Sequence, residues 1–143
     1  MSAGPQFVTA ELALRLVVPD GSPVPVTAGI RYDATDPYAV TVTFFTGASE
    51  PVRWTFARQL LTDGVESSVG EGDVRVWPAH ADGHPIVYIA LSSPSGRALF
   101  EAHLSDVVDF LSRSYLAVPT GSESDFVDVA AELSLLLSDD TNL

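Results

Sequence analysis

The feature that most constrains the fold is a two-residue alternation of apolar and polar side chains through the first hundred residues. From Phe7 to Val18 every second side chain is apolar, and the pattern returns from Val24 to Asp33. Successive side chains of a strand point to opposite faces, so this alternation is typical of β-strands with one buried face. A turn-forming stretch, Pro19 to Pro23, separates the two runs. Most of the chain is therefore predicted to be antiparallel β-sheet.

The alternation continues in two groups of strands with a short helix between them. The first group continues with strands at 38–46 and 52–56, and the second has strands at 73–77, 86–91 and 97–102, with a weaker one at 65–69. Residues 57–63 form the short helix, which Gly64 ends. Pro78 is expected to end the strand before it, because proline cannot donate to a β-ladder.

The last forty residues change to the period of an α-helix. Apolar side chains three and four residues apart run from Leu104 to Tyr115, where Ser105 or His103 is a candidate cap, and again from Phe126 to Leu137. This order predicts an α+β fold, with two antiparallel sheets of about seven to eight strands, a short helix between the strand groups and two C-terminal helices. Residues 1–143 are expected to form a single domain, with 1–6 disordered and 138–143 frayed.

The charge of the chain excludes several classes of partner. Seven arginines, no lysine and 19 acids give a net charge of −12. From Glu101 onwards there are nine acids and one arginine, which supply −8 of this total. Proteins that bind nucleic acid or anionic lipid need clustered cations, and the arginines are spread almost evenly along the chain. With no apolar run of about 18 residues and no secretory signal pattern, a cytoplasmic protein is expected.

The residues that could carry chemistry are few. The chain has no cysteine, and its segment from His80 to His84 reads either as metal ligands or, as we favour, as a hairpin turn at Asp82 and Gly83. Trp54 and Trp77 could stack on bases, but without a basic groove a core position is favoured for both. We therefore expect no enzyme activity, no metal and no cofactor.

Self-association is expected from the composition. Hydrophobic residues make up 46% of the chain and charged residues 18%, against about 25% charged in an average soluble domain. Such a chain has more apolar surface than its own core needs, and antiparallel sheets have edges to cover. A homo-oligomer is therefore predicted.

A series of motifs along the chain resembles one protein family. In order, these segments are Leu14 to Val18, Arg31 to Asp33, Asp36 to Val40, Phe56 to Arg58, Gly72 to Pro78 and Ile89 to Pro94. Together they resemble the SsgA-like proteins, small acidic sporulation regulators of actinobacteria, and most closely the SsgB branch. The resemblance covers about residues 11–137.

The resemblance implies a function without catalysis. Members of the SsgB branch mark septum sites during sporulation and recruit FtsZ, the tubulin-like division protein, with the help of an SsgA-type paralogue. The resemblance also implies a whirly-like fold and a homotrimer, without membrane insertion. An interaction module for cell division at the septum is therefore expected. The alternative is a regulator that binds single-stranded nucleic acid through whirly-like sheets.

The acidic residues of the two C-terminal helices are the predicted partner surface. They fall off the apolar stripes and are therefore expected to be exposed; they are Asp106, Asp109, Asp125, Asp128 and Glu132. An alternative is that they only keep the oligomer in solution. In that case the strand face around Arg53 and Arg75 is the next candidate.

Overall fold

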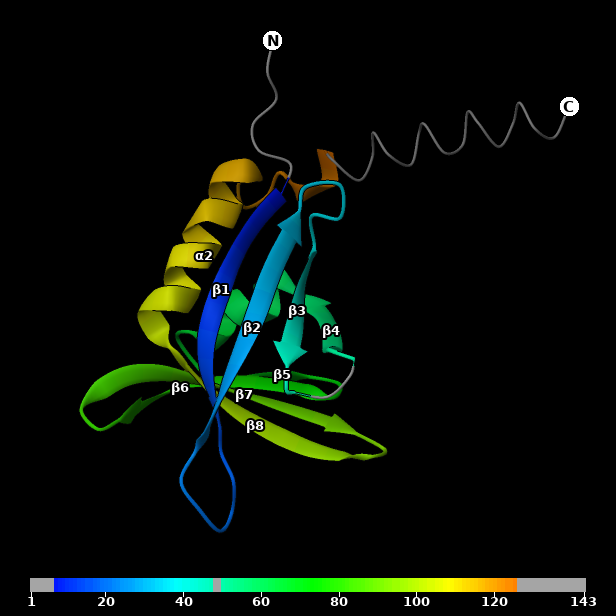
Figure 1. The fold of residues 1–143 in the computed structure, drawn as a ribbon. Helices are drawn as coiled ribbons and strands as arrows, with labels where there is room; N and C mark the ends of the chain where they lie inside the picture. Colours follow the sequence, from blue (N-terminus) through cyan, green and yellow to red (C-terminus); the bar gives the residue numbers. More distant parts are fainter. Residues whose placement is uncertain (1–6, 48–49, 126–143) are drawn as a thin grey trace, which may run out of the picture.

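The structure of the chain, a computed structural model, describes residues 7–47 and 50–125 (Figure 1). The first strand group consists of β1 (Phe7–Leu16), β2 (Val24–Asp33), β3 (Ala39–Phe45) and β4 (Val52–Ala57). The second consists of β5 (Val69–Glu71), β6 (Val74–Ala81), β7 (His84–Ser93) and β8 (Gly96–His103). The helix α1 (Arg58–Gly64) lies between the groups, and α2 (Leu104–Ala117) follows the second. The predicted α+β class, the short helix and the first of the two C-terminal helices are confirmed.

One eight-stranded antiparallel sheet holds both groups, in the order β4-β3-β2-β1-β8-β7-β6-β5. The two groups meet where the end of β1 pairs with β8, through Arg15 with Glu101 and Leu16 with Phe100. The amide of Val17 extends this contact by donating to a β8 carbonyl at 2.8 Å. The expectation of two sheets is thus corrected, because these hydrogen bonds make the sheet continuous. Figure 1 shows the two halves crossing at this junction.

The core lies between the crossing halves of the sheet and the two helices. Phe44 of β3 stacks on Phe100 of β8 with ring centroids 4.4 Å apart, which ties the two halves together. The helix α2 packs against β1, β7 and β8, and it buries Val107, Phe110 and Leu111. These aromatic and branched side chains provide the apolar burial that holds the crossing halves together.

A glycine allows α1 to approach β6 closely. A Cβ atom at Gly64 would overlap the side chain of Val76, which is fully buried. Gly64 is the last residue of α1, one residue beyond the predicted end of the helix, and the helix lies directly on β6 because this position has no side chain.

Two local expectations are wrong. The strand β6 continues through Pro78, which pairs with Val87. The edge strand β5 pairs with β6 only as far as Val76, so Pro78 lies on a free edge where a missing N–H is tolerated. The weak strand expected at 65–69 lies later, at β5, because Val65 is the C-terminal cap of α1. The predicted helix from Phe126 to Leu137 lies outside the described residues, as do the segments 1–6 and 138–143.

Candidate functional site

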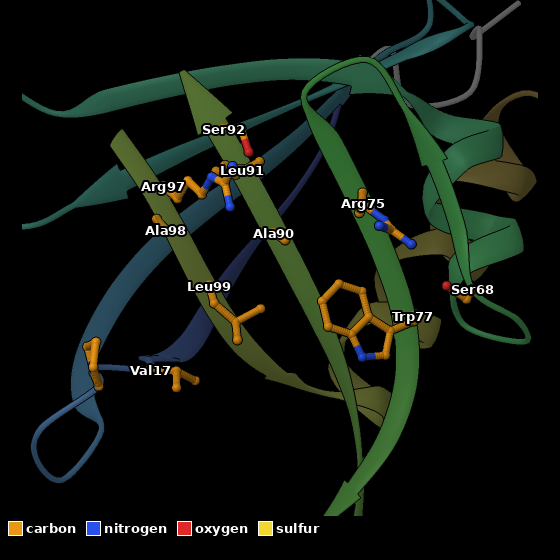
Figure 2. Close-up of a pocket in the computed structure, with 11 residues that line it drawn as sticks. Val17, Ser68, Arg75, Trp77, Ala90, Leu91, Ser92, Arg97, Ala98 and Leu99 are labelled. Atoms are coloured by element: carbon orange, nitrogen blue, oxygen red, sulfur yellow. The ribbon is translucent and has the colours of Figure 1, made fainter. Parts of the chain in front are cut away.

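A groove of about 680 Å³ lies on the outer face of β6, β7 and β8 (Figure 2). Apolar and small side chains make most of its surface, with Trp77 on β6, Ala90 on β7 and Leu99 on β8. Val17 and Pro19, from the turn after β1, close one end, and Ser68 lies beside β5. The groove is therefore a shallow, largely apolar hollow on a face that no other element of the described chain covers.

Two arginines lie on opposite sides of this groove. Arg75 comes from β6 and Arg97 from β8, and both are exposed. No carboxylate of residues 7–47 and 50–125 lies within 4.0 Å of either guanidinium, and none of the lining residues is acidic. In a chain with a net charge of −12, this is a local cationic surface.

The position of Arg75 depends on the strand next to it. Gly70 of β5 pairs with Arg75, and a Cβ atom at Gly70 would lie 3.0 Å from the arginine's Cγ atom. Because Gly70 has no side chain, the aliphatic part of the Arg75 side chain can pack directly over the backbone of β5.

The expectation that Trp77 belongs to the core is wrong. Val74 and Val76 point into the core, and Trp77 points to the opposite face, into the groove. Its ring is half-buried against Tyr88, with centroids 5.4 Å apart. Trp54, in contrast, packs against the core as expected.

The predicted acidic surface is divided in the structure. Asp106 and Asp109 lie three residues apart on the exposed side of α2. Asp125 is also exposed, but it comes after the C-terminal end of this 14-residue helix. The helix is about 20 Å long, and Asp106 and Asp109 lie near its start. Asp128 and Glu132 lie outside the described residues. Asp109 also pairs with Arg113 at 3.7 Å. Of the five predicted carboxylates, the structure therefore shows two together on one helix face, Asp106 and Asp109.

The segment from His80 to His84 forms the predicted hairpin turn. Asp82 and Gly83 have φ angles of 53° and 78°, the left-handed values that a two-residue hairpin requires. Both histidines are exposed on the flanking strands. Within the part of the chain that the structure describes, no three histidine or acidic side chains are grouped as a metal ion would require.

A buried arginine, which the sequence analysis did not single out as a site, joins three distant segments. Arg58 begins α1 and is 1% exposed. Its guanidinium lies 2.9 Å from the carboxylate of Glu123 and donates to the main-chain oxygen of Ser114 at 3.1 Å. It also lies over the rings of Tyr32 and Tyr115, 4.5 and 3.9 Å from their centroids. The cation is thus held by two hydrogen-bond acceptors and two π-faces.

The electrostatics of this cluster shift two pKa values. Hydrogen bonds from its own amide, from Arg58 and from the amide of Gly121 hold the pKa of Glu123 below its usual value, although partial burial opposes them. Burial raises the pKa of Tyr32 to about 12, with the nearby guanidinium acting in the opposite direction. The Tyr32 hydroxyl donates to the carbonyl of Pro37 at 3.0 Å. Because the arginine is almost fully buried and its guanidinium bonds within the chain, we interpret the cluster as structural.

The comparisons with known proteins agree with each other. The family described as "Streptomyces sporulation and cell division protein, SsgA" matches residues 26–123. A protein of Frankia casuarinae named sporulation-specific cell division protein SsgB is 62% identical over 130 residues, 91% of each chain. The protein of the same name from Streptomyces coelicolor is 52% identical, over 92% of this chain and 96% of its own. This chain belongs to the SsgA family.

Solved structures of the SsgA family share the fold. The crystal structure of an SsgA-like sporulation-specific cell division protein from Thermobifida fusca has a TM-score of 0.86 at 47% identity. It covers 94% of this chain and 98% of its own. The SsgB structure from a study of longitudinal cell division in Streptomyces coelicolor has a TM-score of 0.81 at 53% identity, covering 84% and 94%. Such relatives are named as cell division proteins and not as enzymes. Neither helix of the described chain has the length and hydrophobicity needed to cross a membrane.

Proposed function

We propose that this SsgA-family protein is a non-enzymatic division protein that marks septum sites in sporulating cells and recruits FtsZ to them. It would act in the cytoplasm, at the division septum. The observation that carries the proposal is the 62% identity, over 91% of both chains, with a protein named sporulation-specific cell division protein SsgB. The exposed groove and helix surfaces support an interaction role, because they offer contact area to a partner.

Live imaging in the organism that encodes the chain tests this proposal. Fluorescent fusions to the chain and to FtsZ are followed through sporulation. We expect foci of the chain to precede FtsZ rings at the same positions, and deletion of its gene to abolish the regular rings. Rings that form at normal positions in the deletion strain would refute the recruiting role.

The oligomeric state is part of the proposal. We propose a homotrimer, assisted in the cell by an SsgA-type paralogue. Several large apolar side chains of the described residues are exposed and available for such contacts, among them Phe45 at 54% and Leu116 at 83%. Light scattering at micromolar concentration measures the assembly, and a mass of one 15.2 kDa chain would contradict it.

The acidic residues remain a proposed contact surface for FtsZ. In the described part of the chain this surface consists of Asp106 and Asp109 on α2, with Asp125 farther along. Exposed charges of this kind act mainly on the rate and specificity of association.

A second candidate function is binding of single-stranded nucleic acid through a whirly-like fold. The observation that favours it is that Trp77, Arg75 and Arg97 line one groove, because such binders combine aromatic platforms with cations. The net charge of −12 opposes it. A labelled oligonucleotide whose mobility shifts in the presence of the chain, and shifts less at high salt, would support this function.

A further inference from the structure

We infer that the groove on β6, β7 and β8 binds an extended, acidic and apolar segment of a partner protein. The inference rests on the proposed function, and the partner that carries the segment is therefore FtsZ. It deepens that function by assigning the contact to a surface other than the acidic helix. The argument depends on the charge, the spacing and the shape of the groove.

The charge of the groove selects an acidic ligand. Arg75 and Arg97 are two of seven arginines in the chain, and both face one hollow without a carboxylate among its lining residues. The chain as a whole carries a net charge of −12, so an acidic ligand is repelled by most of the surface and attracted to this hollow. Arginine also binds carboxylates in a planar, two-hydrogen-bond arrangement, which gives the site directional specificity.

The spacing of the two arginines indicates the form of the ligand. They come from β6 and β8, with β7 between them, so their backbones lie ~10 Å apart across the sheet. An extended chain advances ~3.3 Å per residue and places residues i, i+2 and i+4 on one face, so carboxylates four residues apart would face the groove together and span this distance. We therefore expect the segment to carry two acidic residues separated by three others, the middle one of which also faces the groove.

The surface between the arginines selects an apolar side chain. Ala90 and Leu99 lie in one cross-strand row with Arg75, and Trp77 is in the next row. Ala90 is small, so it leaves a depression between these larger neighbours (Figure 2). An aliphatic or aromatic side chain placed there would lose water contact against Trp77 and Leu99, as at the centre of a protein interface.

Two variants of the full-length chain test the inference against FtsZ of the same organism. The first, Arg75→Glu with Arg97→Glu, reverses the charge of the groove. The second, Ala90→Phe, fills the depression and leaves the charge unchanged. Because Ala90 is half-exposed on the outer face, the larger ring does not enter the core. Melting curves establish that each variant is folded.

A matched control reverses two other arginines of the same sheet. Arg31 and Arg53 are exposed and line a separate, polar hollow, together with Asp33 and Asp36. Arg31→Glu with Arg53→Glu therefore makes the same change in net charge outside the groove. We expect both groove variants to bind FtsZ about tenfold or more weakly, and the control to stay within about twofold of the unsubstituted chain. Raising the salt concentration should weaken binding of the unsubstituted chain and affect the charge-reversed variant much less.

The outcomes separate this inference from the function on which it rests. If the unsubstituted chain binds FtsZ and both folded groove variants bind it equally well, the groove is refuted and recruitment stands. If the unsubstituted chain does not bind FtsZ, direct recruitment and the inference fail together. If a single-stranded oligonucleotide binds, and the Arg75 and Arg97 reversal abolishes that binding while FtsZ binding persists, the groove belongs to nucleic acid and the inference is overturned.

Discussion

The guanidinium of Arg58 lies 2.9 Å from the carboxylate of Glu123, which is 65 residues later in the chain. This ion pair fastens the segment after α2 to the start of α1, beneath the ring of Tyr115. Since Arg58 is almost fully buried, its charge depends on these partners for the stabilisation that water would otherwise supply.

Replacing Arg58 with methionine should therefore destabilise the protein strongly. The substitution keeps a long apolar stem but removes the cation from the Glu123 carboxylate and leaves the Ser114 carbonyl with only its bond from the amide of Val118. Loss of one partner from a buried ion pair costs about 3–5 kcal/mol, and urea unfolding measures it. Arg113→Met is the control, because its pair with Asp109 is exposed and should cost under about 1 kcal/mol. Equal unfolding midpoints for the two variants would contradict this account of the cluster.

The same pair makes stability depend on acid. The pKa of Glu123 is lower in the folded chain than its ordinary value of 4.5, so the unfolded state binds a proton more readily. The stability that ionised Glu123 contributes to the folded chain is fully present above pH 4.5, and it is lost as the pH falls through the pKa of Glu123 in the folded state. Denaturant unfolding at a series of pH values should show this loss, and Glu123→Gln should remove part of it. The exposed control Glu66→Gln should keep the acid dependence of the unsubstituted chain.

Tyr32 should produce the corresponding effect in alkali. Burial raises its pKa to about 12 from 10.0, so the folded chain resists the ionisation that the unfolded chain permits. Its contribution to stability is complete below pH 10 and declines as the pH rises towards 12. An absorbance titration of the folded chain should show a phenol that ionises at a pH of about 12. Tyr32→Phe should remove this step, and a titration unchanged in that variant would assign the step to another residue.

The sequence predicted the strands better than it predicted how they meet. Alternation is a local signal, and it located most strands to within a few residues, together with Gly64 at the end of α1. The β1–β8 junction joins segments that are far apart in the sequence and uses only the last residues of β1. The alternation of β1 is explained equally well by its pairing with β2 alone. No periodic pattern records such a contact, so two sheets were expected where the chain forms one.

The residues of the site differ in how far the sequence could have shown them. Trp77 follows Val76 directly, so its opposite orientation could have been read from the alternation itself. The burial of Arg58 could not, because its partners Ser114 and Glu123 are 56 and 65 residues away and a charged residue at a helix start usually faces water. The groove depends on side chains of three strands, and only the sheet order brings them together.

The close approach of α1 to β6 gives a further prediction. Gly64→Ala places a methyl group against the fully buried side chain of Val76, which must move together with its strand or helix. Overpacking of this kind costs about 1–3 kcal/mol, measurable by thermal or urea unfolding. Adding Val76→Ala should relieve the overlap, so that the double variant loses less than the sum of the single losses. Gly21→Ala is the control, because its added carbon would lie 3.8 Å from its nearest neighbour.

Reversing the acidic surface of α2 tests the remaining proposal for FtsZ contact. Asp106→Lys with Asp109→Lys changes two exposed side chains and leaves the buried face of the helix intact. Asp106 lies in the first turn, where a carboxylate favours the helix dipole, so the reversal should cost up to about 1 kcal/mol of stability. FtsZ binding should weaken by about threefold, mainly through slower association, since exposed charges at the edge of an interface steer encounters.

The control for this surface adds lysines and keeps both carboxylates. Ser105→Lys with Ser112→Lys uses two exposed positions on the same helix. If the carboxylates make the contact, this control should bind FtsZ about as tightly as the unsubstituted chain, and surface plasmon resonance would separate the association rates. If the reversed and control variants bind equally well, the carboxylates of α2 serve only to keep the assembly in solution. Contact with FtsZ would then have to come from another surface, and the groove around Arg75 and Arg97 is the one that offers both charge and apolar area.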